Sequence, residues 1–560
     1  MARTRWFWWV LFLTINALLF LPRSFVSRMG MLEEFQSRVS PFRYLTFFFS
    51  RESDDIFRIS MELILLLWLS VIFTWSFKRT KLVFGWTYVF FMIYMIYDAS
   101  FKKLYHFKPI LANDVTLIKY GVEIIWSDRP LLLLVGLLGL VGLVWVVFRL
   151  VGFLVLQFRI LRIHRTWGFG ILSILCLISL YRLHFHPLLF EDKRHLPIVE
   201  QASFNVVTFS VMRNVTQSLA LQKKVSEFDI TSLSKKNSHL NTLNIREKPN
   251  IFLVFVESYG KVLYDHEGIS SPYLQGLTQF EDRLREKEVR AFSRFSVSPV
   301  SGGGSWLAYT SMLYGADLAT QGLYQKLVND EKFREVPNFL KWLRNQGYKS
   351  IFLSPLATSK RVPDYGIYGE FYGVDEWVKP KVFEGFEGTR YGWGSIPPDQ
   401  YLFHYTKEHF FETERPNVLF FLTKNSHSPF KSPARAVENW QILEQRTEPD
   451  QAAYFSDNPT ADDYLKSVYY ELDYLTRFAG QMNENDLLIL VGDHQPPVIT
   501  KPTDGSETMI HLLSKNQELV ESFEEYGFTE GLRCQTSAQP FSHKDILWPL
   551  VTAITTAYGE

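Results

Sequence analysis

The chain has 560 residues, of which 47% are hydrophobic, and its formal net charge is +1. A chain of this length can bury more than one hydrophobic core, and the near-neutral charge gives no indication of a nucleic-acid partner. Only two cysteines occur, and Cys176 lies inside an apolar run far from Cys534, so we expect no intramolecular disulfide. The fold must therefore be stable through its core alone.

The first third of the chain contains five apolar runs, at 6–22, 59–77, 82–97, 131–148 and 167–181. Each is long enough, or nearly so, for a membrane-spanning helix, which needs roughly 20 residues. The first run follows Arg3 and Arg5, as in an export signal, but LPRSFVSR after it shows no small-residue cleavage pattern. We therefore expect five retained spans in a transmembrane domain at 1–183.

Lysines and arginines near the span ends indicate the orientation of these helices. With the N-terminus in the cytoplasm, the basic residues of the short inner connections are Arg3, Arg5, Lys78, Arg79, Lys81, Arg149, Arg159, Arg162 and Arg165. The outer loops hold a similar number spread over much longer stretches, so the density of charge favours this orientation. Five crossings then place everything after Tyr181 outside the cytoplasmic membrane.

Two further regions follow the apolar runs. Residues 184–248 read as a connector, in which FNVVTFSVMRNVTQSLALQKK predicts an amphipathic helix packed on a core or on the bilayer surface. From 249 to 560 strands and helices alternate, and IFLVFVE, KSIFLSP, NVLFFLT and DLLILVG are continuously apolar, as central strands covered on both faces are. EKFREVPNFLKWLRNQG and ADDYLKSVYYELDYLTRFAGQM predict intervening helices. The expected fold is a mostly parallel sheet sandwiched by helices.

Metal-ligating side chains follow two of these strands. Glu257 ends PNIFLVFVES, and Asp493 and His494 end NDLLILVGDH. Open α/β sheets collect ligands at the carboxyl ends of their strands, and these side chains suit a divalent metal. Taken alone, Glu257 is equally explained as an acid that faces water or caps a helix, and GDH as a turn. Their joint occurrence favours a metal site.

Two more residues stand where chemistry is expected. Ser305 follows three glycines and precedes the helical WLAYTSMLYG, so its backbone can approach an anion at the helix start; the alternative is that Ser305 is an N-cap. A P-loop is excluded because no Gly-Lys-Ser/Thr ending follows. His427 lies in LTKNSHSPF, directly after a strand, where it is either a phosphoryl ligand and proton donor or a structural histidine.

The motifs NIFLVFVES, GGGS to LYG, SHSPF and GDH, in this order, resemble the alkaline-phosphatase-like superfamily. They resemble in particular its lipoteichoic acid synthases and sulfatase-like phosphoglycerol or phosphoethanolamine transferases. RYGWGSIPPDQYLF, with Trp393 and Gly394, is similar to the Trp-Gly segment of that family, and SHKDILWPL to its late motif. With the preceding spans, the resemblance covers nearly the whole chain, and the order and spacing of the motifs make it specific.

The resemblance implies a set of site residues. One divalent metal, Mn²⁺ with Zn²⁺ or Mg²⁺ as alternatives, would be bound by Glu257, Ser305, Asp493 and His494. Ser305 would be the nucleophile, although threonine is usual in the family, and Ser301 and Thr310 are weaker candidates. His427 would contact substrate and serve as acid and base.

The head-group segment departs from the family pattern. Lipoteichoic acid synthases place a histidine, a tryptophan and an arginine where this chain reads LSPLATSKRVPDYGIYGEFYGVDEW, which has no such histidine or tryptophan in line. Lys360 and Arg361 are candidate replacements for the arginine, the alternative being ordinary solvated charges. Trp393 is a further candidate for substrate binding. The identity of the head group therefore stays open.

The resemblance implies a transferase in a bacterial cytoplasmic membrane, with the catalytic domain at 249–560 on the extracytoplasmic side. It would move phosphoglycerol or phosphoethanolamine from a phospholipid donor to a glycan or lipid acceptor through a phospho-Ser305 intermediate. One alternative is a phosphodiesterase or sulfatase that uses the same site, although SWLAY lacks the Cys/Ser-x-Pro-x-Arg of sulfatases. The other is a non-catalytic membrane scaffold.

Overall fold

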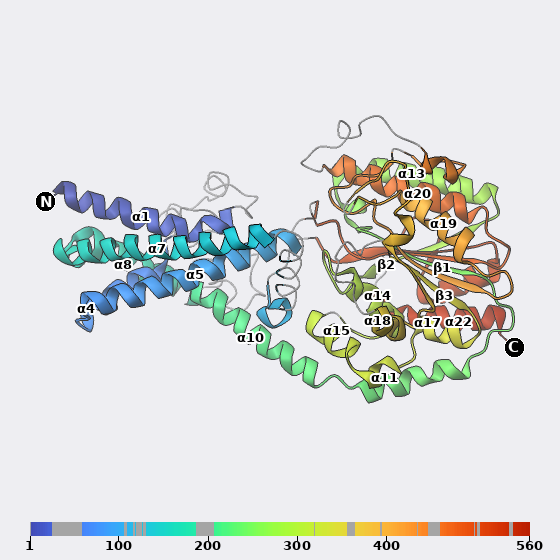
Figure 1. Ribbon diagram of the computed structural model, residues 1–560, viewed down its shortest axis with the longest axis horizontal. Coiled ribbons are helices and arrows are strands. Elements are labelled where there is room, and N and C mark those ends of the chain that lie inside the picture. The colour runs from blue at the N-terminus through green and yellow to red at the C-terminus, as the bar shows by residue number, and fades with distance from the viewer. Residues whose placement is uncertain are drawn as a thin grey trace. The chain divides into compact units, whose positions relative to one another are not determined.

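The computed structural model describes 2–24, 59–105, 109–115, 118, 122, 126, 130–185, 207–318, 320–354, 365–392, 395–433, 435–445, 460–497, 499–500, 504–536 and 541–559. The chain forms two compact units (Figure 1). The N-terminal unit is Met1–Ser226 and the C-terminal unit is Glu227–Glu560. The finer division into 1–183, 184–248 and 249–560 stays a prediction.

Among its described residues, the regular secondary structure of the N-terminal unit is helical. Its helices are α1 (Ala2–Ser24), α4 (Met61–Ile72), α5 (Phe77–Tyr105), α7 (Pro130–Ile160), α8 (Trp167–Phe185) and α10 (Val207–Ser226). Three segments, Arg5–Pro22, Phe77–Lys102 and Pro130–Ile160, are long and apolar enough to cross a membrane, and Met61–Ile72 and Trp167–Leu177 are shorter apolar helices. Each of the five predicted apolar runs therefore coincides with an apolar helix. The count of five membrane spans stays a prediction.

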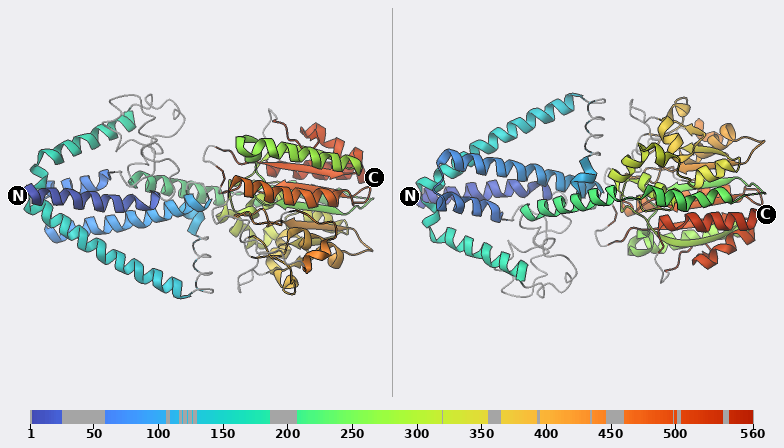
Figure 2. Two further views of the ribbon diagram at one scale, coloured as in Figure 1. Left: turned by 90° about the horizontal axis from the view of Figure 1, so that it is seen from above. Right: turned by 90° about the horizontal axis from the view of Figure 1, so that it is seen from below.

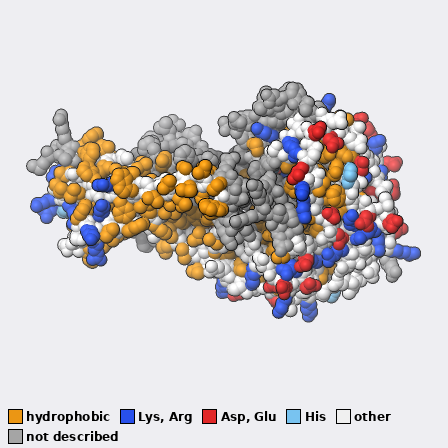
Figure 3. Space-filling model, in the orientation of Figure 1, with side chains coloured by type: hydrophobic (Ala, Val, Ile, Leu, Met, Phe, Trp, Pro, Cys, Tyr) orange, Lys and Arg blue, Asp and Glu red, His pale blue; other side chains and the backbone are white. Residues whose placement is uncertain are grey.

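The surface of the N-terminal unit is apolar as well as its interior. An aromatic core forms around Trp8, where Phe12 stacks on the indole and Phe158 and Phe169 pack beside it. Outside, α7 leaves Leu131 77% exposed and Leu138 65% exposed. Apolar side chains cover much of the visible face of this unit, whereas charges of both signs are interspersed on the C-terminal unit (Figure 3). A helix that is apolar all round suits a lipid environment.

The C-terminal unit is built on an eight-stranded sheet with the order β4-β3-β5-β1-β6-β7-β2-β8. The strands are β1 (Ile251–Val256), β2 (Arg290–Val297), β3 (Lys349–Leu353), β4 (Glu376–Val378), β5 (Asn417–Leu422), β6 (Leu487–Gly492), β7 (Glu507–Ser514) and β8 (Thr529–Glu530). The four strands predicted from apolar runs are β1, β3, β5 and β6. They lie together, with β1 between β5 and β6.

The sheet is mixed, so the expectation of a mostly parallel sheet is not confirmed. The pairs from β4 to β6 are parallel, whereas β6–β7, β7–β2 and β2–β8 are antiparallel. The sequence pattern found only the parallel block because its strands are buried on both faces and therefore continuously apolar. Strand β2, RAFSRFSV, carries serines and arginines between its phenylalanines and lacks that pattern.

Helices cover both faces of this sheet (Figures 1 and 2). One layer holds α13 (Glu267–Glu286), α19 (Asp399–Phe410) and α20 (Ala461–Ala479); the other holds α14 (Ser305–Tyr314), α17 (Phe339–Asn345) and α22 (Leu547–Tyr558). The two faces of β1 show this division, because Phe252 packs on Phe478 of α20 while Phe255 packs on Tyr309 of α14. The predicted sandwich of helices around a sheet is therefore present.

Shorter helices connect these layers: α11 (Ile230–Asn237), α12 (Val262–Asp265), α15 (Gln321–Val328), α16 (Glu331–Arg334), α18 (Tyr365–Tyr372) and α21 (Gln517–Glu521). The segment EKFREVPNFLKWLRNQG, expected as a helical stretch, divides into α16 and α17. Pro337 falls between them, where its ring cannot continue a helix.

We predict that Thr460→Ala destabilises the C-terminal unit by about 1 kcal/mol. Thr460 and Asp463 form a capping box at the start of α20, with Asp463 N donating to Thr460 Oγ1 at 3.1 Å and Thr460 N donating to Asp463 Oδ2 at 2.9 Å. Thermal unfolding of the full-length protein should show a lower midpoint for Thr460→Ala. Thr460→Ser keeps the hydroxyl and should unfold like the wild type; equal midpoints for all three proteins would contradict the prediction.

Candidate metal centre and active site

The register of three parallel strands creates the site. Val256 at the end of β1 pairs with Gly492 at the end of β6, and Phe255 pairs with Leu422 at the end of β5. The residue that follows each of these three strands therefore lies at the same edge of the sheet. Glu257 follows β1, Asp493 follows β6 and Thr423 follows β5, and Glu257 N donates to Thr423 Oγ1 at 2.9 Å.

Three of the predicted ligands meet at this edge. One ligand atom from each of Glu257, Asp493 and His494 lies within 4.8 Å of the other two, and all three residues are buried. His494 Nε2 is 3.4 Å from Glu257 Oε1 and 3.4 Å from Asp493 Oδ2. Two carboxylates and an imidazole at this spacing suit a divalent cation.

The imidazole of His494 is oriented for coordination. Its Nδ1 is 2.8 Å from the Gln495 carbonyl oxygen, which accepts only if Nδ1 carries the proton. That assigns Nε2 as the unprotonated nitrogen, and this buried atom makes no hydrogen bond among the described residues. A ring held by one nitrogen with a lone pair on the other is the usual arrangement of a metal-binding histidine. The residues present therefore fit a metal.

Backbone donors fix the carboxylate of Asp493. Its Oδ1 accepts hydrogen bonds from Ser258 N and from His494 N, both at 2.7 Å. Ser258 adopts φ 58°, a left-handed conformation that turns the chain after β1 and aims this amide at Asp493. Because Oδ1 is occupied, Oδ2 is the oxygen that faces Glu257 and His494.

Burial and nearby charges shift the pKa values of Glu257 and Asp493. Burial alone would raise the pKa of Glu257, but the charge of the nearby Lys424 ammonium and a hydrogen bond from Ser258 oppose burial, and the pKa is lowered to about 2. Burial and the negative charge of Glu257 raise the pKa of Asp493 to about 6. Glu257 is therefore ionised, and a second anion beside it is costly without a cation.

Ser305 is the first residue of α14 and lies beside the acids. The N-cap is Gly304, at φ 76°, so the N-cap interpretation of Ser305 is wrong. The Ser305 side chain lies close enough to the Asp493 carboxylate to lower the pKa of that acid, which opposes the larger effect of burial. The other nucleophile candidate on α14, Thr310, is buried and contacts the Tyr372 hydroxyl at 3.1 Å instead. The helix start presents free N–H groups near Ser305.

His427 and Lys424 follow β5 on the same edge. The His427 Nδ1 lies 2.6 Å from the Ser428 carbonyl oxygen, and burial is the main cause that lowers the His427 pKa, so the ring is neutral near pH 7. The Lys424 ammonium lies 3.5 Å from Glu257 Oε2 and is buried. Lys424 was not predicted, although it stands within the LTKNSHSPF motif, three positions before the histidine.

The sulfatase family model matches residues 249–521, a range that holds every residue of the cluster. The match covers just under half of the chain and lies within the C-terminal unit. The predicted sulfatase-like character is confirmed by this match. No curated protein matches the sequence.

Several solved structures align with the chain at low identity. The lipoteichoic acid synthase LtaP from Listeria monocytogenes is 15% identical with a TM-score of 0.35, covering 58% of this chain and 78% of its own. The periplasmic domain of EptC from Escherichia coli, in complex with Zn, is 13% identical with a TM-score of 0.34 and covers 56% and 86%. Streptococcus pyogenes phosphoglycerol transferase GacH, in complex with sn-glycerol-1-phosphate, is 13% identical with a TM-score of 0.36 and covers 58% and 80%.

Asp399 holds the loop that carries Lys424 and His427. Asp399 Oδ2 accepts from Lys424 N at 2.5 Å and from Asn425 N at 2.6 Å. Burial raises the pKa of Asp399 to about 6, and burial with the Asp399 charge raises the pKa of Glu471 well above its usual range. Asp399 therefore anchors this loop through backbone hydrogen bonds, and Glu471 influences the pKa of the same carboxyl group.

Close backbone packing fixes the spacing of the strand ends. A Cβ on Gly492 would lie 2.0 Å from the Tyr259 carbonyl oxygen, so only glycine fits immediately before Asp493. Ser426 Oγ donates to the Glu257 carbonyl oxygen at 2.7 Å, which ties the β5 loop to the β1 end. The main chain, rather than flexible side chains, sets the separation of the ligands.

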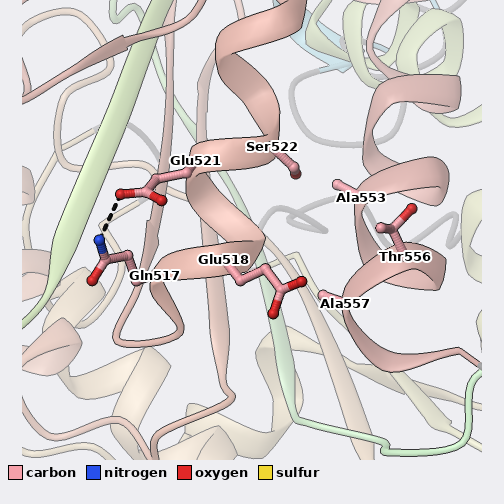
Figure 4. Close-up of a pocket in the computed structure, with 7 residues that line it drawn as sticks. All are labelled: Gln517, Glu518, Glu521, Ser522, Ala553, Thr556 and Ala557. Atoms are coloured by element: carbon pink, nitrogen blue, oxygen red, sulfur yellow. Dashed lines mark hydrogen bonds between the residues drawn. The ribbon is translucent and has the colours of Figure 1, made fainter.

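Two predicted substrate residues, Trp393 and Arg361, lie outside the described residues. A separate hollow of about 530 Å³ lies between α21 and α22 and contains none of the predicted residues (Figure 4). Its polar lining includes Gln517, whose Nε2 donates to Glu521 at 2.7 Å. Ser522 and Thr556 line this hollow, but among the described residues the group of side chains that could hold a metal lies at the strand ends, so the strand-end cluster is the stronger candidate site.

We predict that Lys424→Met lowers the stability of the metal-free protein by about 3 kcal/mol or more, because Glu257 loses its buried counter-charge. Added Mn²⁺ should raise the unfolding midpoint of the variant by more than it raises that of the wild type. Lys466→Met, which removes a largely exposed lysine paired with Asp462, should change little. A metal-free Lys424→Met protein as stable as the wild type would show that Lys424 does not compensate Glu257.

Proposed function

We propose that this protein is a membrane-anchored, metal-dependent transferase. It moves a phosphoglycerol or phosphoethanolamine head group from a phospholipid to a glycan or lipid acceptor. The observation that supports this most directly is the Ser305 hydroxyl at a helix start, close to Asp493 of the Glu257, Asp493 and His494 cluster. The match to the sulfatase family model supports ester chemistry at this cluster, and the apolar helices support a lipid substrate that stays in the bilayer.

The cluster residues would hold one divalent cation, Mn²⁺ being favoured. When bound, such a cation lowers the pKa of the Ser305 hydroxyl and neutralises charge on the phosphoryl oxygens. Lys424, held against Glu257, adds positive charge on the same edge of the sheet. Free N–H groups at the start of α14 are directed at the same phosphoryl group.

Transfer proceeds in two displacements at phosphorus. In the first, Ser305 Oγ forms a bond to phosphorus, the bond to the diacylglycerol oxygen breaks, and the Ser305 proton ends on the released diacylglycerol. In the second, an acceptor hydroxyl attacks phosphorus, the Ser305 Oγ bond breaks, and the acceptor proton returns to Ser305. His427, a neutral imidazole beside the cluster, is the group that relays these protons.

Hydrolysis is the competing function, because the sulfatase family model is the one that matches. Water would then replace the acceptor hydroxyl in the second displacement and release free glycerol phosphate or ethanolamine phosphate. A sulfate ester is disfavoured because SWLAY lacks the Cys/Ser-x-Pro-x-Arg sequence. Release of a soluble phosphomonoester at the rate of diacylglycerol formation, with or without glycan acceptor, would assign the hydrolase.

We predict a covalent head-group adduct on Ser305. Full-length protein is incubated with Mn²⁺ and either phosphatidylglycerol or phosphatidylethanolamine, quenched in acid and digested for mass spectrometry. The added mass identifies the transferred group, and Ser305→Ala should abolish both the adduct and diacylglycerol release. Ser301→Ala is the matched control and should keep both, whereas an adduct on Ser301 or Thr310 would refute the nucleophile assignment.

We also predict that metal removal abolishes activity reversibly. A chelator should stop diacylglycerol release, and Mn²⁺ should restore it. Glu257→Gln should weaken Mn²⁺ binding by about tenfold or more, since even residues that only support metal ligands contribute 10- to 100-fold. Calorimetric titration measures this change, with the exposed Glu267→Gln as control. Unchanged Mn²⁺ affinity in Glu257→Gln would exclude this carboxylate as a ligand.

A further inference from the structure

A buried histidine near the C-terminus links the strand that leads to Asp493 with strand β2. His543 is the first residue of the short helix η9 (His543–Asp545), and its side chain is buried. Its Nε2 lies 2.9 Å from the Gly492 carbonyl oxygen at the end of β6, and its Nδ1 lies 2.9 Å from Ser296 Oγ on β2. Strand β7 lies between β6 and β2 in the sheet, so the imidazole connects two strands that do not pair with each other.

Both ring nitrogens of His543 are occupied. A carbonyl oxygen only accepts hydrogen bonds, so Nε2 carries the proton and donates to Gly492, while Nδ1 accepts from the Ser296 hydroxyl. Burial lowers the pKa of His543 to about 4, which keeps the ring neutral near pH 7. His543 therefore has no nitrogen left for a metal or a substrate, unlike His494, and acts only through the groups that it holds.

Each end of this link lies beside a part of the candidate site. Gly492 immediately precedes Asp493, and Ser296 lies near the end of β2, from which the chain continues to Ser305. Ser298, at the start of that loop, donates from its Oγ to the Asp493 carbonyl oxygen at 2.5 Å. The link therefore sets the spacing of β6 and β2 where the predicted ligand and the loop of the predicted nucleophile leave the sheet.

The same segment contacts the helix of the predicted nucleophile. Helix η9 packs against α14, whose first residue is Ser305. The His543 ring lies 6.4 Å from the Phe255 ring, and Phe255 packs in turn on Tyr309 of α14 at 5.9 Å. The segment that begins with His543 therefore contacts both the strand ends and the helix that presents Ser305.

We infer that His543 is a positioning residue, which fixes the distance between Asp493 and Ser305 by joining Gly492 to Ser296. This inference rests on the proposed function, because that function makes Ser305 the nucleophile. The imidazole contacts no reacting atom. A displacement of about 1 Å in a reacting group can lower a rate by about 100-fold, so a residue outside the site can control the rate through position alone.

Metal affinity and nucleophile position should respond differently to the loss of this link. The Asp493 carboxylate is held by Ser258 N and His494 N, and neither of these hydrogen bonds involves His543. Removing the link should therefore leave the affinity for a divalent metal unchanged while residue 305 moves away from the metal. A histidine that only stabilises the core would lower the unfolding midpoint and leave the position of residue 305 unchanged.

Strand β2 offers a matched control. Ser293 Oγ lies 2.7 Å from Nδ1 of the buried His511, so Ser293→Ala also removes a serine–histidine hydrogen bond from this strand. Positions 293 and 296 face opposite sides of the sheet, because successive side chains of a strand alternate. Ser293→Ala and Ser296→Ala should therefore lower the unfolding midpoint similarly, but only Ser296→Ala should affect residue 305.

Cobalt spectroscopy measures the position of residue 305 without any transfer reaction. In the full-length Ser305→Cys protein, Co²⁺ at the cluster should show the charge-transfer absorption of a cobalt–thiolate bond, because thiolates bind such metals well. The wild type supplies the blank, since its two cysteines are buried elsewhere. Adding Ser296→Ala should weaken this band at saturating Co²⁺, whereas adding Ser293→Ala should not. Bands of equal strength in both double variants overturn the positioning role.

The rate of adduct formation is the second measurement. With Ser305 in place and with saturating Mn²⁺ and phosphatidylglycerol, the adduct should form about tenfold or more slowly in Ser296→Ala than in wild type. Ser293→Ala should react at the wild-type rate. His543→Gln keeps one donor and one acceptor, so it should recover part of the rate that His543→Leu loses. Equal rates in Ser296→Ala and Ser293→Ala overturn the proposal.

The two measurements separate this inference from the proposed function. A cobalt–thiolate band that Ser296→Ala weakens, together with no adduct in the wild type, would reject the transfer reaction and still support the positioning role. An adduct in the wild type, together with a band that Ser296→Ala and Ser293→Ala leave equally strong, would support the transfer reaction and overturn the positioning role.

Discussion

The placement of β1 between β5 and β6 is the constraint on which the candidate site depends. Because all three strands run parallel, their carboxyl ends supply Glu257, the Lys424 to His427 loop, and Asp493 with His494 to one edge. The result is two buried carboxylates beside an imidazole whose free nitrogen faces them. Burying two carboxylates together is costly without positive charge, which Lys424 supplies in part and a divalent metal would complete.

Strands buried on both faces were predictable, and strands with mixed composition were not. The runs that became β1, β3, β5 and β6 are continuously apolar, and their order along the chain was enough to predict Glu257, Asp493 and His494 as neighbours. Strands β2 and β7 carry buried polar groups, such as Ser293 hydrogen-bonded to His511 across the pair, and so resemble no standard pattern. Their antiparallel pairing made the sheet mixed.

The local sequence could not distinguish between alternative roles for some residues, because three-dimensional contacts decide between them. Ser305 could equally have been an N-cap, and Gly304 at φ 76° takes that position instead. Lys424 has no sequence signature, because a lysine after a strand is usually solvated; its burial against Glu257 arises from the pairing of β5 with β1. In the same way, Asp98 and Arg213 lie far apart in sequence and meet only through the packing of α10 on α5.

The close approach of Gly492 to the Tyr259 carbonyl oxygen bears on how metal preference can change in this protein. Because the main chain is packed closely there, we expect a larger or smaller ion to be accommodated by side chains rather than by a shift of the strands. Selectivity must instead come from the reach and chemistry of individual side chains. Shortening Glu257 to aspartate, or exchanging Asp493 for asparagine, would alter the preferred ion while the strand framework stays in place. The strand ends would thus set the spacing of the side chains around any ion that the cluster binds.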